Sequence, residues 1–273
     1  MRIINLISLA AVALVLGLNI TVAEAAKKPV IKAQPGNPLG EIYSGYNMRD
    51  PKTQAMQDDD FENPGMLWVE QGADLWNKVD GKAGKSCASC HNEAEKSMKG
   101  VGAKYPVYRE DLKSVQNLEL KVNECRTKQM QAKPWKYESN EMMGTVAFIK
   151  FQSRGMPVNV TIKGEGAKAK FELGKKFYYQ RRGQLDMSCA SCHEQHQGVH
   201  IRSDYLTQGQ SNGFPTFRLK WQKMGTLHRR FKGCNKNIRA KPYKRGSQEY
   251  LNLEYYLGWR GNGLPVETPS VRN

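Results

Sequence analysis

The hexapeptide SCASCH occurs twice in the sequence, at residues 86–91 and again at residues 188–193. Each copy contains Cys-x-x-Cys-His, the attachment motif of c-type haem. Two thiols three positions apart can form thioethers to both vinyl groups of one haem, and the adjacent histidine can then bind the iron. A zinc site or a disulfide is the alternative for a single copy. Two copies in one chain favour two covalently bound haem c groups.

This motif predicts six residues at the two haems. The attachment residues are Cys87, Cys90, Cys189 and Cys192, and the proximal iron ligands are His91 and His193.

The two motifs lie at equivalent points of an internal duplication. Residues 70–91 align without gaps on residues 172–193, at an offset of 102. The later matches keep their order at offsets of 109 and 108: YPVY (105–108) with FPTF (214–217), AKPWKYESNE (132–141) with AKPYKRGSQE (240–249), and GMPV (155–158) with GLPV (263–266). Matches in constant order indicate tandem repeats of about 90 residues.

Each repeat is predicted to begin and end with a helix. Residues 68–79 and 171–178 have apolar side chains at helical spacing. Ser139 and Ser247 are plausible N-caps of the second helix in each repeat. No segment shows the alternation typical of a strand, so we predict a mainly α protein with two tandem cytochrome c-like domains and long loops. The expected divisions are a signal peptide (1–25), an N-terminal extension (26–66), domain 1 (67–160) and domain 2 (168–267).

The N-terminus has the pattern of an export signal. Arg2 precedes an apolar run from Leu9 to Leu18, and Ala23-Glu24-Ala25 has the form of a cleavage site. The run is short for a membrane-spanning helix, although an uncleaved anchor is the alternative. No later segment is apolar enough to span a bilayer. We therefore expect a periplasmic protein with a cleaved signal peptide and no membrane span.

The charge is strongly positive, with a formal net value of +16. Removing residues 1–25 removes one cation and one anion and leaves that value unchanged. Such a balance favours an acidic partner, a membrane surface or nucleic acid. Export and the lack of recognition motifs argue against nucleic acid. Small anions or an acidic protein surface are the preferred interpretation.

Two cysteines remain, at matched positions before AKPWK and AKPYK. Cys125 and Cys234 could form one disulfide between the repeats, or each could bind the iron of its own haem as a thiolate. Equivalent positions in tandem domains face different haems, which favours ligation by Cys125 and Cys234. No methionine occurs at matched positions in this region. The second repeat alone has three further candidate ligands, His196, His200 and His228.

The cysteine segments of the two repeats differ in charge. LHRRFKGC (227–234) stands where the first repeat has LELKVNEC (118–125). In a helix, Arg230 would lie one turn before Cys234 and could bind an oxyanion through two parallel hydrogen bonds. The first repeat has Lys121 there, with acidic residues beside it. If one haem is a substrate site, we expect the second, although a solvated basic loop is the alternative.

With these residues placed, the chain resembles the SoxA family, the dihaem subunit of the SoxAX cytochrome of sulfur oxidation. The resemblance extends over about Glu41 to Val266 and rests on SGYNMRDPKTQAMQDDDFENPGMLWVEQG (44–72), both CASCH motifs, and Arg230 with Cys234. It implies two cytochrome c-like domains with His/Cys-ligated haems. It also implies that the second haem's cysteine is found as a persulfide.

The resemblance further implies an enzyme that oxidatively couples thiosulfate to a cysteine of a SoxYZ-like carrier protein, as an L-cysteine S-thiosulfotransferase. Cys234 would then be both iron ligand and sulfur-handling group, Arg230 the anion-binding group, and a SoxX-like monohaem cytochrome the partner subunit. CNKNIR (234–239) is more basic than is typical of the family. An electron-transfer dihaem cytochrome and a tetrathionate-forming thiosulfate dehydrogenase are the alternative functions.

Overall fold

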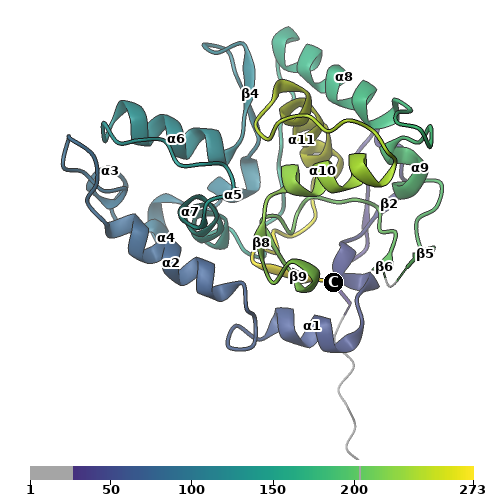
Figure 1. Ribbon diagram of the computed structural model, residues 1–273, viewed down its shortest axis with the longest axis horizontal. Helices are drawn as coiled ribbons and strands as arrows, with labels where there is room; N and C mark the ends of the chain where they lie inside the picture. Colours follow the sequence, from purple (N-terminus) through teal and green to yellow (C-terminus); the bar gives the residue numbers. More distant parts are fainter. Residues whose placement is uncertain (1–26, 203) are drawn as a thin grey trace, which may run out of the picture.

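The computed structural model describes residues 27–202 and 204–273, so the predicted signal peptide lies outside the described residues (Figure 1). Helices supply most of the regular structure of this part. Their bounds are α1 (Pro51–Asp58), α2 (Met66–Asn77), α3 (Ala88–His91), α4 (Ala94–Ser97), α5 (Val101–Lys104), α6 (Leu118–Lys128), α7 (Asn140–Phe151), α8 (Glu165–Tyr179), α9 (Cys189–His193), α10 (Leu227–Asn237) and α11 (Gln248–Arg260), with 3-10 turns at Gly45–Met48 and Leu219–Trp221.

The strands are two or three residues long. They are β1 (Ile31–Lys32), β2 (Glu41–Ile42), β3 (Val107–Arg109), β4 (Ser114–Gln116), β5 (His200–Ile201), β6 (Asp204–Tyr205), β7 (Thr216–Arg218), β8 (Lys223–Gly225) and β9 (Ser270–Arg272). Most form antiparallel hairpins, and β9 adds to β7 in parallel. The prediction of a mainly α fold with long loops is confirmed. These short hairpins have no sequence alternation that could have predicted them.

The duplicated sequence folds into duplicated elements. In the first repeat α2, α3, the β3–β4 hairpin, α6 and α7 follow one another, and α8, α9, the β7–β8 hairpin, α10 and α11 repeat that order. Ser139 caps α7 by accepting a hydrogen bond from the Met142 amide, as predicted. Ser247 occupies the cap position of α11 without such a bond. Val79, expected on the apolar stripe of the first helix, lies beyond its end and is exposed.

Matched glycines let the first and last helix of each repeat pack closely. A Cβ on Gly72 would lie 2.2 Å from the Gly144 carbonyl oxygen, and a Cβ on Gly174 would lie 1.9 Å from that of Asn252. Only glycine permits this separation of the backbones. The repeated glycine therefore fixes the helix pair that supports each haem motif.

The two repeats meet through equivalent segments that run antiparallel. Pro157 of GMPV pairs with Pro265 of GLPV. On either side of this pair, the Val158 amide donates to the Leu264 carbonyl and the Val266 amide to the Met156 carbonyl, each at 2.9 Å. Equivalent segments paired in this way relate the repeats by a local twofold axis. The haem motifs accordingly lie on opposite sides of the molecule, α3 on one and α9 on the other (Figure 1).

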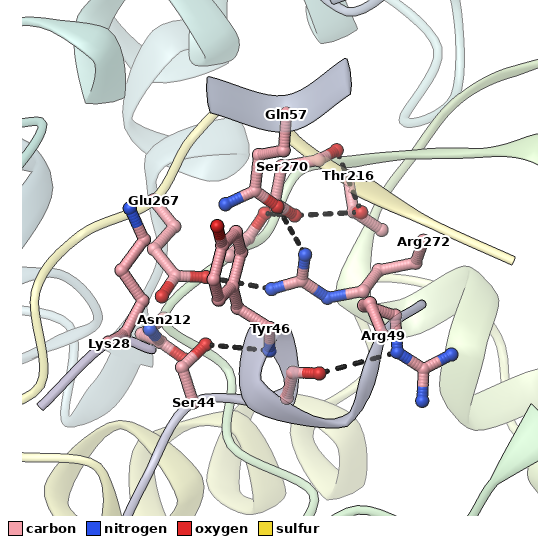
Figure 2. Close-up of polar contacts among 12 residues, drawn as sticks. Lys28, Ser44, Tyr46, Arg49, Gln57, Asn212, Thr216, Glu267, Ser270 and Arg272 are labelled. Carbon is pink, nitrogen blue, oxygen red and sulfur yellow. Dashed lines mark hydrogen bonds and ion pairs between the residues drawn. The ribbon is translucent and has the colours of Figure 1, made fainter. Parts of the chain in front are cut away.

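The N-terminal extension packs against the second repeat and the C-terminal strand. Figure 2 shows Tyr46 and Gln57 of the extension beside Glu267 and Arg272. The Val271 amide donates to Gln57 Oε1 at 3.0 Å, and Arg272 Nη2 donates to Glu267 at 2.7 Å. Within residues 27–202 and 204–273, no helix is both long and apolar enough to cross a membrane.

Candidate haem sites

The second Cys-x-x-Cys-His motif forms the short helix α9. Ser188 caps it, exchanging hydrogen bonds with Ser191, whose side chain accepts from the Ser188 amide at 3.1 Å. The two serines of SCASCH thus form the N-terminal capping box of this helix. Because the motif is helical, Cys192 and Cys189 lie nearly one turn apart with His193 directly after.

The imidazole of His193 is held in one orientation. Its Nδ1 lies 2.7 Å from the Thr207 carbonyl oxygen, to which it donates, so Nε2 remains for a metal. Gly209, with φ of +72°, leaves room for the ring, because a Cβ there would lie 2.8 Å from His193 Cγ. Sequence reasoning missed Thr207 and Gly209, which have no counterpart motif in the first repeat.

Cys234 lies on α10 and its thiol faces His193. Burial raises the pKa of this thiol, but the positive charge of Arg230, contact with His193 and the charge of Arg218 more than offset it. The resulting pKa is about 6. Cys234 therefore favours the thiolate at neutral pH, the form in which sulfur binds iron and acts as a nucleophile.

Arg230 lies on α10, as the spacing predicted, one turn before Cys234. Within the described residues it makes neither a salt bridge nor a side-chain hydrogen bond. Arg218, the other cation acting on the thiol, was missed at the sequence level. Its signal was present in FPTFR (214–218), the counterpart of YPVYR (105–109).

The first site has the same layout with different electrostatics. Cys125 lies on α6, facing the motif helix α3, and burial raises its pKa. Lys121 lowers that pKa and Glu124 raises it, so the thiol stays above its usual range. His91 is exposed and has no hydrogen bond from its ring within the described part of the chain, although Trp76 lies beside it, with ring centroids 5.8 Å apart.

The alternative disulfide is not formed, and the three other candidate histidine ligands make contacts elsewhere. All six cysteines are free, so Cys125 and Cys234 do not form the alternative disulfide. His228 is buried, accepts a hydrogen bond from the Gly246 amide and lies 3.0 Å from Glu254. His196 contacts the Ser191 carbonyl, and the His200 ring lies against the Tyr205 ring, tilted by 34°.

The residues present suit a covalently attached haem at each motif. Each set combines two thiols in or next to the motif helix, a histidine directly after them, and a cysteine from a second helix. At the second site the oriented ring and the glycine behind it fit an imidazole bound to iron through Nε2.

Comparison with known proteins finds similarity over most of the chain. The family model of the SoxA/TsdA cytochrome c domain matches residues 71–158 and 173–266. "L-cysteine S-thiosulfotransferase subunit SoxA" of Pseudaminobacter salicylatoxidans is 48% identical over 88% of this chain and 84% of its own length. The protein of the same name from Paracoccus pantotrophus is 47% identical over 85% of this chain and 79% of its own. This chain belongs to the SoxA family.

The structure agrees with that membership. The crystal structure of SoxXA from P. pantotrophus superimposes with a TM-score of 0.83 at 47% identity, covering 86% of this chain and 88% of that chain. In this SoxA-family chain, both Cys-x-x-Cys-His motifs and both remaining cysteines lie inside the two matched segments. The expected cytochrome c domains are therefore confirmed, and with them covalently bound haem c as cofactor.

Proposed function

We propose that this chain is the L-cysteine S-thiosulfotransferase subunit of a periplasmic sulfur-oxidising cytochrome. It couples thiosulfate to a cysteine of a SoxYZ-like carrier protein and carries two haem c groups. Residues 1–25 act as the signal peptide, 26–66 as an extension, and 67–160 and 168–267 as the two domains. The names of the relatives and the two matched segments support this assignment.

The observation that carries the proposal is the surroundings of the Cys234 thiol. A thiol with its pKa lowered to about 6 faces His193, and Arg230, one turn away on the same helix, has no salt bridge within the described residues. Perturbed pKa values beside a specific cation mark functional sites. An electron-transfer cytochrome needs a ligand on the iron but has no use for an anion-binding group beside it.

The reaction joins two sulfur nucleophiles and must release electrons. The carrier thiolate, R–S⁻, and thiosulfate together lose two electrons and form R–S–S–SO3⁻, with a new bond between the carrier sulfur and the terminal sulfur of thiosulfate. No group leaves. Haem, when bound, supplies an acceptor for electrons of this kind.

The residues of this chain supply binding and orientation. Arg230 binds the sulfonate end of thiosulfate through paired hydrogen bonds. Cys234 handles the sulfur and, together with His193, would hold the haem iron, while the Thr207 carbonyl keeps the His193 ring in place. In the first site, His91 and Cys125 hold a haem with a structural or electron-storage role.

A SoxX-like monohaem cytochrome is the proposed partner subunit, because the superimposed crystal structure is a SoxXA complex. The positive charge of the chain, +16, favours the approach of an anionic substrate and of an acidic carrier surface.

The test is the substitution Arg230→Ala in the holoprotein, complexed with its cytochrome subunit. The loss of a charge-assisted contact in a partly dry site is expected to lower kcat/KM for coupling by roughly a hundredfold. Lys121→Ala, at the equivalent place in the first repeat, is the matched control and should leave turnover unchanged. Unchanged turnover in Arg230→Ala would favour the electron-transfer function instead.

A tetrathionate-forming thiosulfate dehydrogenase is the second candidate, because the matching family model covers TsdA as well as SoxA. Incubation with thiosulfate and an electron acceptor, without carrier, separates the two functions. Tetrathionate as the main product would support the dehydrogenase. Product formed only with the carrier present would support the thiosulfotransferase.

A further inference from the structure

The N-terminal extension lies against the loop that holds the His193 ring. The Tyr43 amide donates to Gln208 Oε1, and Gln208 Nε2 donates to the Glu41 carbonyl, each at 3.1 Å. Gln208 directly follows Thr207, whose carbonyl oxygen accepts the hydrogen bond of His193 Nδ1. One side chain therefore joins the backbone of the extension to the loop that orients the imidazole.

Gln208 is held at both its side chain and its backbone. Its side chain is buried, and its carbonyl accepts a hydrogen bond from Arg260 Nη1 at 2.6 Å. Nη2 of the same buried arginine donates at 3.2 Å to Glu194, the residue directly after His193. Removing the Gln208 amide would leave a backbone donor and a backbone acceptor of the extension unpaired, which is costly in a buried place.

The extension contacts the same loop at a second point. A Cβ on Gly45 would lie 3.4 Å from Thr207 Cγ2, so the backbone of the extension packs against this side chain. The neighbouring residues Ser44 and Tyr46 are fully buried, and the Tyr46 amide donates to Ser44 Oγ (Figure 2). The segment that contacts Thr207 is thus fixed on both sides of Gly45.

The first repeat has no equivalent of this loop. The offset between the repeats rises from 102 at the haem motifs to 109 at YPVY and FPTF, so the second repeat has the longer loop, and this loop contains Thr207 and Gln208. His91 is exposed, and its ring makes no hydrogen bond in the part of the chain that the structure describes. The extension therefore supports one of two histidines that occupy equivalent motifs.

We propose that Gln208 is a positioning residue, through which the N-terminal extension fixes the orientation and the basicity of His193 as a haem ligand. The inference rests on the proposed function only for His193 as the iron ligand of the second haem. A hydrogen bond donated by the ring nitrogen that does not bind the metal makes the imidazole a stronger ligand. A stronger ligand favours ferric iron and lowers the reduction potential, and such hydrogen bonds are one of the means by which a protein sets that potential.

The experiment measures the reduction potential of each haem in the holoprotein, by a redox titration followed by electron paramagnetic resonance. Cys125→Ser identifies the signal of the first haem. Gln208→Met keeps a side chain of similar length but removes both bonds to the extension, so the Thr207 carbonyl is expected to hold His193 less firmly. The equilibrium constant for reduction of the second haem should rise on the order of tenfold, about 59 mV for one electron, and that of the first haem should stay unchanged.

Three further variants separate this effect from a general loosening of the extension. Gly45→Val places a branched side chain against Thr207 and should also raise the potential of the second haem. Gly45→Ala, whose single methyl group fits at 3.4 Å, should not. Gln34→Met removes the bond from Gln34 Nε2 to the Trp259 carbonyl, at 2.7 Å, and should leave both potentials unchanged.

An unchanged second potential in Gln208→Met overturns the inference, and so does an equal shift of both haems or an equal shift in Gln34→Met. A wild-type protein without haem at the second motif overturns it as well. If Gln208→Met fails to retain the second haem, Gly45→Val decides, and an unchanged potential in that variant overturns the inference. Coupling of thiosulfate to the carrier is measured separately on wild type. Its absence overturns the proposed function but leaves the effect of Gln208 on the second potential standing.

Discussion

The cysteine helices α6 and α10 occupy equivalent places in the two repeats, yet they surround their thiols with opposite chemistry. Beside Cys125, Glu124 accepts hydrogen bonds from Lys121 and Lys128, so both of these cations already have a partner. Beside Cys234, Arg230 is unpaired within the described residues, and the thiol pKa falls to about 6. One fold thus contains a thiol whose neighbouring cations are paired and a thiol beside an arginine without a partner in the described residues. The chemistry depends on the site and not on the fold.

The largest effect should come from removing each thiol in turn. Cys234→Ser is expected to lower coupling turnover by at least about a thousandfold, because it removes both the sulfur-handling group and an iron ligand. Cys125→Ser should cost less than about tenfold, because that haem is not the substrate site. Turnover of the complex measures both, with absorption spectra to count haems. Equal losses would contradict the division of roles.

A smaller effect is expected from giving α10 the charge pattern of α6. Gly233 matches Glu124 in sequence, and no atom lies within 4 Å of a Cβ placed there, so a side chain fits. Gly233→Glu should raise the pKa of Cys234 and raise KM for thiosulfate about tenfold, because a carboxylate repels the anion. Gly233→Gln, which adds the same bulk without charge, is the control. Equal KM values in the two variants would show that charge at this position is irrelevant.

The smallest expected effect concerns the stability of the contact between the repeats. Glu119 of the first repeat matches His228 of the second. Burial and the charge of Glu254 raise the pKa of Glu119 to about 8, while Lys150 acts against that rise. Because the folded state holds this proton more tightly than the unfolded chain does, the contribution of Glu119 to stability falls as pH rises from about 4.5 to 8.

Glu119→Gln should remove that dependence. The variant is expected to gain stability relative to wild type with rising pH, by up to roughly 1.4 kcal/mol per pH unit in this window. Urea unfolding of the holoprotein at several pH values measures it. Glu165→Gln, at a residue whose side chain is 91% exposed, is the control and should follow wild type. A pH-independent difference between Glu119→Gln and wild type would contradict a buried, protonated Glu119.

Sequence reasoning succeeded where one local pattern carries the information. SCASCH and the position of Arg230 before Cys234 depend on neighbours a few residues apart, and the duplication shows in segments that match in constant order, so the helices and the cysteine positions could be predicted. The contacts of Arg218 could not, because its partners Asp204 and Asn273 lie 14 and 55 residues away along the chain. The pairing of GMPV with GLPV could not be predicted from the sequence either, because periodicity indicates which face is buried but not what packs against it.

The antiparallel pairing at Pro157 and Pro265 has a consequence for how such a chain could diverge. Equivalent surfaces that contact each other about a twofold axis have the geometry of a homodimer whose subunits have become one chain. In a homodimer, a substitution that adds positive charge at one thiol adds it at both. In a fused pair each copy changes alone, so charge can be added beside Cys234 without being added beside Cys125. Linkage of the two subunits therefore lets one copy specialise while the other keeps its original role.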